Sequence, residues 1–352
     1  MARALVMLSG GLDSTLVVRL LVDLGLAVEA VHFTSPFCRC TPDSWGCSAA
    51  HRAAEASGVA VHVVAGREDY LEVVKRPRFG RGSRMNACID CRIFMLSRTR
   101  ELMARLGADF VATGEVLGQR PMSQRRDTMD LIERESGMAG LVVRPLCARL
   151  LPPSVPEQKG WIDRSKLLAI QGRSRRPQME LAEARGVRDY PCPAGGCLLN
   201  DPQFAERFKD LLEWQPDFGL ADARLLKWGR HFRLESGTKV VVGRDEAENG
   251  PIEAAAREGD VVLAPVRVPG PTALCLGKPS DGDVETAATL VATFTKSPGP
   301  IELRIKVHGA DAAAERTVSA TPMSRSWAER WRVGAERKAS SNAGVPSEGK
   351  GT

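Results

Sequence analysis

The stretch that decides the fold reads Ala4-Leu5-Val6-Met7-Leu8-Ser9-Gly10-Gly11-Leu12-Asp13-Ser14. Its apolar first part predicts a buried strand, and helix-like spacing follows from Leu12 to Leu24. The glycine pair between them permits backbone conformations closed to other residues, so its N–H groups can approach an anion closely. A helix that begins at this turn adds its positive end. We therefore predict a phosphate-binding turn at the first strand-to-helix junction.

The side chains of this turn suit the same ligand. Ser9 and Ser14 offer hydroxyl donors for phosphate oxygens, and Asp13 offers a carboxylate for a magnesium ion on pyrophosphate. The lysine of a Walker loop is missing, so the turn is not the G-x-x-x-x-G-K-[ST] loop of phosphoryl-transfer enzymes. The alternative is that the glycine pair only makes a tight turn.

Strand-like and helix-like runs alternate beyond the turn. Strands are expected at 27–33, 59–64, 109–113 and 141–146, and helices at 43–57 and 92–106. This alternation predicts an α/β domain with a parallel sheet.

The composition and periodicity of the sequence change twice after this domain. We expect the nucleotide-binding domain at 1–165, followed at 166–220 by a basic, cysteine-bearing extension that completes the site. This extension is expected to be helix-poor around residues 173–176 and to form a short helix at 202–212. Strand-like runs at 230–234, 239–243, 261–266 and 272–276 predict a smaller α+β domain over 221–310. The last segment, 311–352, is rich in small and charged residues, and we expect a mostly disordered tail.

Composition limits the class of protein. The chain has 352 residues, of which 43% are hydrophobic, and no apolar stretch approaches 18 residues, so no membrane partner is expected. The first eight residues lack the pattern of a secretory signal, and we expect a cytoplasmic enzyme. The formal net charge of +6 favours a polyanionic partner such as RNA, although it is equally explained by solubility.

Nine cysteines in such a chain call for a metal or redox explanation. Cys88 and Cys91 form a C-x-x-C pair, and Cys192 and Cys197 form a later pair. Thiolates at C-x-x-C spacing can face one metal centre, and a distant third cysteine can close the site, leaving one iron of a cubane open. An iron-sulfur cluster, a persulfide relay and structural zinc all fit this spacing.

The other cysteines are less informative. Cys38, Cys40 and Cys47 could bind zinc, serve a redox role or be ordinary loop thiols. Cys147 and Cys275 lie on apolar runs, and we expect buried, inert thiols there.

Residues 9–14, SGGLDS, resemble the PP-loop of the N-type ATP pyrophosphatases, which cleave ATP between its α and β phosphates. The resemblance implies a doubly wound parallel sheet of the adenine nucleotide α-hydrolase type, with ATP and Mg²⁺ at the carboxyl ends of the strands. The ATP-binding residues that it implies are Ser9, Gly10, Gly11, Leu12, Asp13, Ser14, His32, Phe33, Gly114 and Gln119.

Residues 114–124, GEVLGQRPMSQ, are similar to the G-E-x-L-G-Q-x-x-S-Q segment of 4-thiouridine synthetases of the ThiI group, with one extra residue before Ser123. Arg144-Pro145-Leu146 follows as R-P-L does in that group. The resemblance implies ATP-dependent sulfur transfer to tRNA, with Gly114 and Gln119 in the nucleotide or target-base pocket. Glu115 would lie there too or be a satisfied surface carboxylate.

Residues 86–91 and 195–198 are similar to the segments around the paired cysteines of the 2-thiouridylases of the MnmA group. A compact chain with C-x-x-C and a later cysteine also resembles the tRNA thiolases that hold a three-cysteine [4Fe-4S] cluster. By these matches Asp13, Cys91 and Cys197 are the catalytic residues. Cys88 completes the cluster ligands, and Cys192 is the substitute for Cys197.

The implied reaction is adenylation of a tRNA uridine carbonyl followed by sulfur transfer, with 4-thiouridine favoured over 2-thiouridine. Sulfur would come from sulfide or a cysteine desulfurase, through the cluster or through a cysteine persulfide. A homodimer is compatible with this enzyme. For RNA contact we predict Arg173, Arg175 and Arg176, and then Arg120, Arg125 and Arg126, although a charge cluster is equally a solvated face.

The carboxy-terminal part resembles the NFACT-R module of RNA-associated proteins over residues 230–233 and 239–244, Asn249 and residues 269–271. Residues 245–250 lack the usual N-D pair of that module. The likeness implies RNA docking. It also supports a hypothesis of another class, an RNA-binding quality-control or adaptor protein with a vestigial ATP site.

Overall fold

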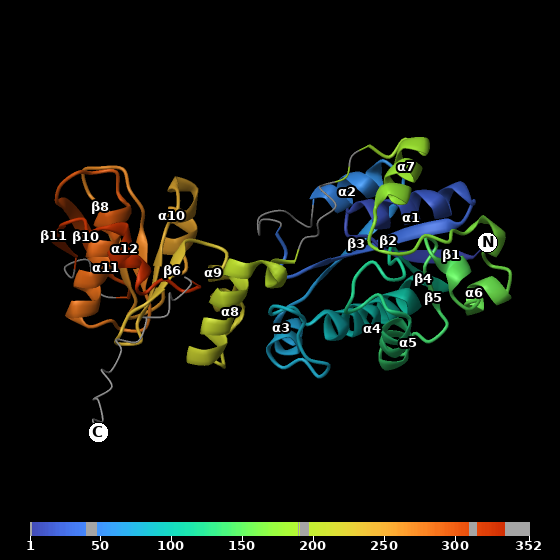
Figure 1. Ribbon diagram of the computed structural model, residues 1–352, viewed down its shortest axis with the longest axis horizontal. Helices are drawn as coiled ribbons and strands as arrows, with labels where there is room; N and C mark the ends of the chain where they lie inside the picture. The colour runs from blue at the N-terminus through green and yellow to red at the C-terminus, as the bar shows by residue number, and fades with distance from the viewer. Residues whose placement is uncertain (1, 40–47, 189, 191–196, 310–314, 335–352) are drawn as a thin grey trace, which may run out of the picture. The chain divides into compact units, whose positions relative to one another are not determined.

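A computed structural model describes residues 2–39, 48–188, 190, 197–309 and 315–334 of the chain (Figure 1). The chain divides into two compact units, Met1–Lys227 and Trp228–Thr352, and each is described by itself.

The first unit is built on a five-stranded sheet in the order β3-β2-β1-β4-β5, and every neighbouring pair is parallel. The sheet confirms the expected doubly wound α/β fold. Its strand order reverses between β1 and β4, and in sheets of this kind ligands bind at the carboxyl ends of the strands beside such a point. The strands are β1 (Arg3–Met7), β2 (Ala27–Thr34), β3 (Ala60–Ala65), β4 (Phe110–Thr113) and β5 (Val142–Val143).

Helices cover both faces of this sheet (Figure 1). Alternate residues of β1 point to opposite faces, so Ala4 and Val6 join one core and Leu5 and Met7 join the other. The helices of the first core are α1 (Leu12–Asp23), α2 (Ser48–Glu55) and α7 (Arg176–Ala184). Those of the second core are α4 (Cys88–Leu106) and α5 (Arg126–Glu135).

A third core joins residues 197–226 to the same unit. The ring of Phe37, which follows β2, lies 5.4 Å from the ring of Phe208 and 6.2 Å from that of Tyr70. The expected extension at 166–220 is therefore part of the first compact unit. The elements of this core are α3 (Glu68–Lys75), η3 (Leu198–Asn200), α8 (Pro202–Trp214) and α9 (Leu220–Leu225). Short elements elsewhere are η1 (Ala148–Leu150), α6 (Val155–Gln158) and η2 (Arg164–Lys166).

The expectation of a helix-poor stretch around residues 173–176 is wrong at its last residue, where a helix begins. Helix α7 begins at Arg176, with Pro177 in its first turn. Proline is tolerated at this position because the first amides of a helix have no partner within the helix.

The second unit contains a six-stranded antiparallel sheet in the order β11-β10-β8-β9-β7-β6, which agrees with a separate α+β domain. Helix α11 (Asp281–Phe294) packs on the sheet, and α10 (Glu246–Glu253) contacts β9. The strands are β6 (Arg230–Arg233), β7 (Lys239–Val242), β8 (Val261–Pro265), β9 (Ala273–Cys275), β10 (Ile301–Val307) and β11 (Arg316–Ala320).

The expectation of a disordered tail from residue 311 is wrong for residues 315–334. Strand β11 pairs with β10, and helix α12 (Arg325–Glu329) follows it. The rings of Trp327 and Trp331 lie 4.6 Å apart and pack against the core of the unit. A few large apolar groups therefore bind a segment whose average composition suggested disorder. Residues 335–352 lie outside the described part of the chain.

Substitution of Gly10 should reveal how closely the turn packs. Gly10 and Gly25 share a φ of +76°, but a Cβ on Gly10 would lie 2.5 Å from the backbone nitrogen of Ala50, whereas none of the described atoms lies within 4 Å at Gly25. We expect Gly25→Ala to lower the free energy of unfolding by about 1–2 kcal/mol through its left-handed backbone alone. Gly10→Ala should cost roughly 1–3 kcal/mol more, through overpacking.

Denaturant unfolding of both variants measures this difference. Equal losses of stability would contradict the close approach of the turn to α2.

Candidate nucleotide and cysteine site

The predicted phosphate-binding turn lies at the point where the strand order reverses. Gly10 adopts a positive φ, and Gly11 precedes the first turn of α1 without any side-chain cap. The hydroxyls of Ser9 and Ser14 lie 3.1 Å apart, and the Ser14 hydroxyl donates to the Gly11 carbonyl. The start of α1 therefore offers backbone N–H groups and two hydroxyls to an anion.

Gly114 closes the other side of this loop. It directly follows β4, and a Cβ there would lie 2.6 Å from the backbone nitrogen of Ser14. The loops after β1 and β4 can meet so closely only because residue 114 has no side chain.

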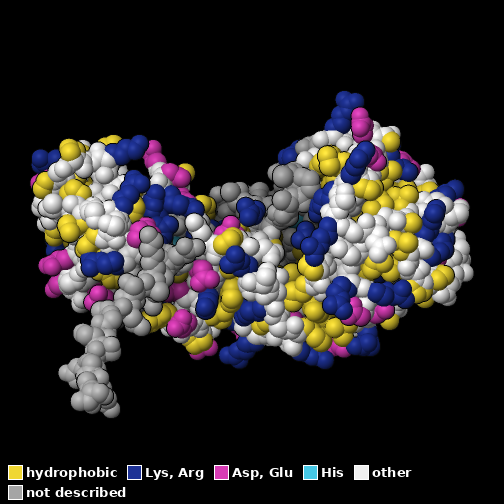
Figure 2. Space-filling model, in the orientation of Figure 1, with side chains coloured by type: hydrophobic (Ala, Val, Ile, Leu, Met, Phe, Trp, Pro, Cys, Tyr) yellow, Lys and Arg dark blue, Asp and Glu magenta, His cyan; other side chains and the backbone are white. Residues whose placement is uncertain are grey.

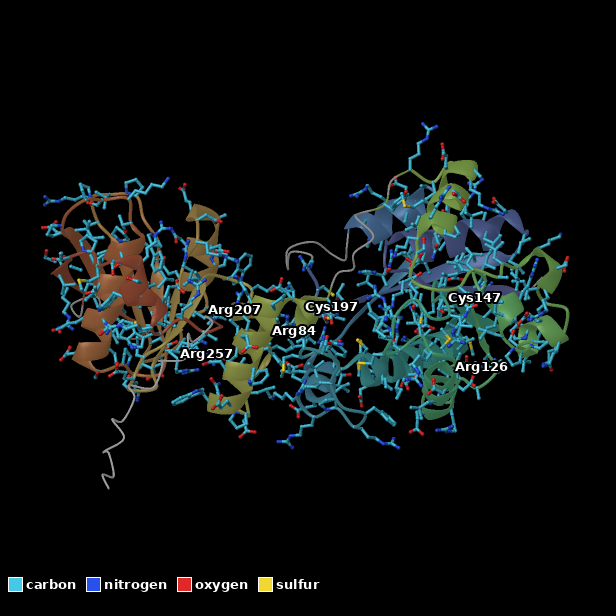
Figure 3. The ribbon with its side chains drawn as sticks, viewed as in Figure 1. Arg84, Arg126, Cys147, Cys197, Arg207 and Arg257 are labelled. Carbon is cyan, nitrogen blue, oxygen red and sulfur yellow. The ribbon has the colours of Figure 1, made fainter. Side chains whose placement is uncertain are left out.

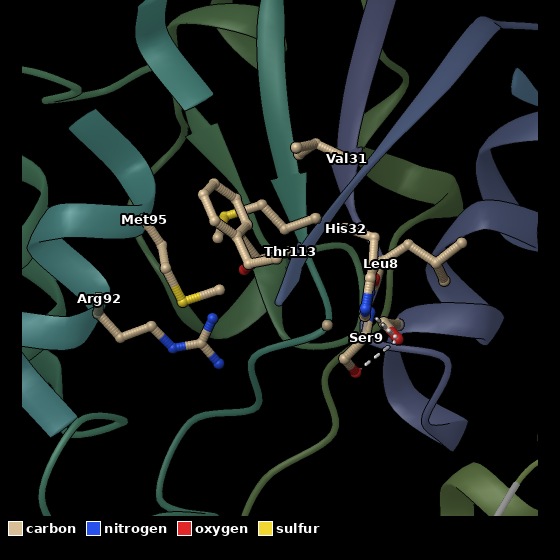
Figure 4. A pocket seen from close by; sticks show the side chains of 11 residues that line it. Leu8, Ser9, Val31, His32, Arg92, Met95 and Thr113 are labelled. Carbon is tan, nitrogen blue, oxygen red and sulfur yellow. Dashed lines mark hydrogen bonds between the residues drawn. The ribbon is translucent and has the colours of Figure 1, made fainter. Parts of the chain in front are cut away.

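A pocket opens beside the loop at the carboxyl ends of β1, β2 and β4 (Figure 4). Arg92 and Met95 extend into it from α4, opposite Ser9 and His32 (Figure 4). The sequence did not indicate the roles of Arg92 and Met95, because only the fold turns this face of α4 toward the loop. The pocket lining includes five of the predicted ATP-binding residues, Ser9, Ser14, His32, Phe33 and Gly114.

His32 is a fixed, neutral part of this pocket. Its Nδ1 lies 2.8 Å from the carbonyl oxygen of Leu8, which can only accept a hydrogen bond, so Nδ1 holds the proton. Burial lowers the pKa of His32, against the effect of this hydrogen bond, and the ring is neutral at neutral pH. His32 can therefore position a ligand at this place, and its framing of adenine stays a prediction.

Asp13 is held by residues that come from distant parts of the sequence. Its Oδ2 accepts a hydrogen bond from Gln119 at 2.8 Å and lies 3.6 Å from the guanidinium of Arg175. Gln119 in turn accepts a hydrogen bond from the buried Gln178 at 2.9 Å. The other carboxylate oxygen, Oδ1, is buried without a hydrogen-bond partner among the described residues. An unpartnered carboxylate oxygen beside a phosphate-binding loop suits a hard cation such as Mg²⁺.

Glu115 is the centre of a buried ion network, which corrects the alternative of a surface carboxylate. Its side chain is 3% exposed and lies 3.0 Å from Arg144 and 3.3 Å from Arg92. Arg144 also pairs with Glu133 of α5. Burial raises the pKa of Glu115, but the charges of Arg92 and Arg144 outweigh this and hold the pKa below its ordinary value. The network joins the loop after β4 to the helix that bears the C-x-x-C pair.

The C-x-x-C pair occupies the first turn of α4. Cys88 and Cys91 are three residues apart and so share one side of the helix. The side-chain amide of Asn86 donates to Cys88 Sγ at 3.1 Å, and the Tyr70 hydroxyl lies 3.1 Å from Cys91 Sγ. The distant Cys197 reaches the same site, because its thiol interacts electrostatically with both cysteines.

Two thiols of this site, those of Cys91 and Cys197, have pKa values raised by burial. Although Cys197 is exposed, the protein that crowds its thiol, followed by the nearby Cys91 and Cys88, raises its pKa to about 12. Burial raises the pKa of Cys91, although Tyr70 and Arg92 oppose the shift. A bound metal centre would therefore have to displace protons from these thiols.

The donor chemistry of this site suits a thiophilic centre, since three thiols converge from two distant segments. In the part of the chain that the structure describes, no three His, Cys, Asp or Glu side chains are already arranged to hold a metal ion. Cys192, the predicted substitute ligand, lies outside the described residues, as do Cys40 and Cys47. Cys147 and Cys275 are fully buried, as expected, and Cys147 lies apart from Cys197 in Figure 3.

The arginines predicted to contact RNA have different surroundings. Arg173 is exposed, Arg176 pairs with Glu180 on its own helix at 2.8 Å, and Arg175 faces Asp13. Burial, followed by the charges of Arg92 and Arg175, lowers the pKa of Arg120, while Cys88 and Asp13 oppose the shift. Contact of Arg173 and Arg176 with RNA stays a prediction.

Two family models match separate parts of the chain. Residues 1–149 match the thiamine biosynthesis protein (ThiI) model, and residues 229–332 match the NFACT protein RNA binding domain model. The chain joins a ThiI-family domain to an NFACT-R domain. No curated protein matches it. None of the described helices is long and apolar enough to cross a membrane.

Solved structures with low sequence identity resemble parts of the chain. A predicted subunit of a tRNA methyltransferase from Methanocaldococcus jannaschii is 13% identical, with a TM-score of 0.33 over 52% of this chain and 76% of that one. The U34-tRNA thiolase NcsA from Methanococcus maripaludis, with its [4Fe-4S] cluster, is 15% identical, with a TM-score of 0.30 over 64% and 69%. A 4-thiouridine synthetase in complex with RNA and ATP is 19% identical, with a TM-score of 0.36 over 64% of this chain and 52% of that one.

The NFACT-R domain carries a cluster of mutually repelling arginines. Burial, followed by the charge of Arg332 and then those of Arg244 and Arg325, lowers the pKa of Arg230, while Glu248 opposes the shift. The neighbouring Arg330 stacks over Trp331, 4.7 Å from its ring centre. On the face drawn in Figure 2, dark blue Lys and Arg side chains lie on both units. Gathered positive charge beside partly buried aromatic rings is compatible with a nucleic-acid surface.

Removal of the Glu115 charge should destabilise the ThiI-family domain. In Glu115→Gln the buried guanidinium of Arg144 and the partly buried one of Arg92 lose their shared partner, and we expect the free energy of unfolding to fall by about 3–5 kcal/mol. The carboxylate contributes fully above its ordinary pKa of 4.5, and the contribution is lost as the pH falls through the lower folded-state value. Unfolding in denaturant between pH 7 and pH 3 measures both effects.

Glu180→Gln is the matched control, because Glu180 pairs with Arg176 on the surface. It should leave the unfolding midpoint unchanged. A Glu115→Gln variant as stable as this control would contradict the buried network.

Proposed function

We propose that the chain is an ATP-dependent tRNA sulfurtransferase that converts a uridine to thiouridine, 4-thiouridine in preference to 2-thiouridine. The supporting observation is that the nucleotide pocket and the cysteine site share the first turns of α4. Arg92 lines the pocket together with Ser9 and Ser14, while Cys88 and Cys91 lie in the preceding turn of the same helix. Activation of a substrate and delivery of sulfur would thus take place side by side.

The loop would perform the activation. A uridine carbonyl oxygen is a poor leaving group until it is adenylated, and ATP would supply the adenylyl group with release of pyrophosphate. The N–H groups at the start of α1 and the hydroxyls of Ser9 and Ser14 would stabilise the negative charge that develops on pyrophosphate. Asp13, through its unpartnered Oδ1, would hold the Mg²⁺ ion that neutralises part of this charge.

The cysteines would perform the delivery. Cys88, Cys91 and Cys197 would hold the [4Fe-4S] cluster, which supplies an open iron coordination site for sulfide. Asn86 and Tyr70 orient the thiols of Cys88 and Cys91 by hydrogen bonds, as outer residues do around metal ligands. The sulfur donor would be sulfide itself or a cysteine desulfurase, in the cytoplasm.

Two other functions compete with this proposal. A persulfide on Cys91 or Cys197 could carry the sulfur without any cluster, and this mechanism requires the same loop. Alternatively, the NFACT-R domain could supply the whole function as an RNA-binding adaptor, with a vestigial ATP site. The buried Gln119 and Gln178 that hold Asp13 argue against decay of that site, since a vestigial loop would not require them.

Variants of Asp13 and Cys91 test the proposed reaction. After anaerobic incubation with ATP, sulfide and unmodified tRNA, nucleosides are analysed by mass spectrometry and released pyrophosphate is measured. We expect Asp13→Asn to lower pyrophosphate release at least ~100-fold, as the loss of one charge-stabilising group does in other enzymes. Cys91→Ala should abolish thiouridine.

Cys147→Ala is the matched control, since Cys147 is buried away from Cys197, and it should keep both activities. Iron quantitation separates the two sulfur-transfer mechanisms when a cysteine desulfurase and cysteine replace sulfide, because sulfide alone cannot form a persulfide without an oxidant. Thiolation by iron-free protein under these conditions would favour the persulfide. The absence of tRNA-dependent pyrophosphate release in the wild-type protein would favour the adaptor.

Variants of the arginine cluster test RNA docking by the NFACT-R domain. We expect Arg325→Gln and Arg332→Gln each to weaken tRNA binding and to reduce the slope of log affinity against log salt by about 0.7–0.9 per lost phosphate contact. Filter binding between 50 and 200 mM salt, roughly the range over which phosphate contacts are felt, measures this slope. Arg316→Gln is the control, because Arg316 is exposed but paired with Asp281, and its slope should equal that of the wild type.

A further inference from the structure

Cys38 lies directly opposite Cys197 in an antiparallel bridge between two segments that are far apart in the sequence. The amide of Leu198 donates to the carbonyl of Phe37 at 2.8 Å, which is the hydrogen bond expected beside a non-hydrogen-bonded pair. Residues in such a pair have Cα atoms about 4.5 Å apart and side chains on the same face. Disulfides form at Cα separations of roughly 4.4–6.8 Å. The backbone therefore brings these two thiols within disulfide range.

Both partners are anchored by the third core of the ThiI-family unit. Phe37 is 1% exposed and packs edge-on against Phe208, and Leu199 is 2% exposed. The amide of Cys38 donates to the carbonyl of Ser35 at 3.1 Å. Phe37, directly before Cys38, and Leu199, two residues after Cys197, are thus fixed by the core. The two cysteines would therefore meet without a motion of the chain.

Both thiols of the pair are accessible. Cys38 is partly exposed and Cys197 is exposed, whereas Cys147 is fully buried. An oxidant from solvent can therefore reach Cys38 and Cys197.

We propose that Cys38 is a fourth functional thiol of the cysteine site. It forms a disulfide with Cys197 when no other group is bound to Cys197. The pairing rests on the backbone alone, whereas its consequence for sulfur transfer rests on the proposed function. In the disulfide, Cys197 has no free thiolate for sulfur transfer. Thiolation would therefore stop until a thiol reductant cleaved the disulfide.

The chemistry is thiol–disulfide exchange with a small disulfide such as oxidised glutathione. The thiolate of one cysteine attacks a sulfur of oxidised glutathione and releases one reduced glutathione. The second cysteine attacks the protein sulfur of this mixed disulfide and releases the other. The two protein thiols lose two electrons and two protons, and one oxidised glutathione becomes two reduced molecules.

The test uses the iron-free, full-length protein incubated with oxidised glutathione, then blocked with a maleimide and digested without reductant. We expect one cross-linked peptide that joins Cys38 to Cys197, reversed by dithiothreitol. In Cys38→Ser, Cys197 should instead carry a glutathione that leaves only on reduction. In Cys147→Ser the cross-link should form as in the wild type.

A cross-link from Cys197 to any other cysteine, or the absence of a cross-link, would overturn the pairing. Iron-loaded protein separates this inference from the cluster, because bound iron should prevent the cross-link if Cys197 is a ligand. A protein that takes up no iron but still forms the cross-link would keep the pairing and remove the cluster. Loss of thiolation in the oxidised wild type in proportion to the cross-linked fraction, with full recovery after dithiothreitol, would support the consequence for sulfur transfer.

Discussion

The close approach of two loops at the reversal of strand order is the constraint on which the site depends. Gly10 packs against the backbone of α2, and Gly114 packs against the first turn of α1. A side chain on Gly10 would push the turn away from α2, and a side chain on Gly114 would push the loop after β4 away from α1. Because these contacts leave no room for adjustment, the N–H groups of the turn are fixed before any ligand arrives, and little binding energy would be lost in ordering them.

The second constraint is electrostatic and joins this loop pair to the cysteines. Glu115, which follows Gly114, is paired with Arg144 and with Arg92 of α4 in a buried environment. Such pairs contribute little net stability compared with apolar packing, but a broken pair is costly. The network therefore holds α4 in one register against the loop after β4. As a result, Arg92 and Met95 on one face of α4 line the pocket, and the first turn of α4 carries the thiols of Cys88 and Cys91.

Asp13 shows how a single short motif acquires its environment from the whole domain. The motif supplies the carboxylate, the segment after β4 supplies Gln119, and the loop and helix near residue 178 supply Arg175 and Gln178. Arg175, predicted as an RNA contact from its basic neighbours, lies beside the carboxylate instead. A charge read from sequence identifies a cation, but only its neighbours in space determine which anion it faces.

The sequence by itself determined the parallel sheet, the glycine turn between β1 and α1 and the C-x-x-C pair, because strand periodicity, the glycine pair and cysteine spacing are local properties of the chain. It did not show that residues 315–334 join the second sheet, since a few tryptophan contacts outweigh a polar composition there. The tertiary structure alone decided that Glu115 is buried, that Arg92 lines the pocket and that Cys38 faces Cys197. These are contacts between residues up to 159 positions apart, set by packing of distant segments.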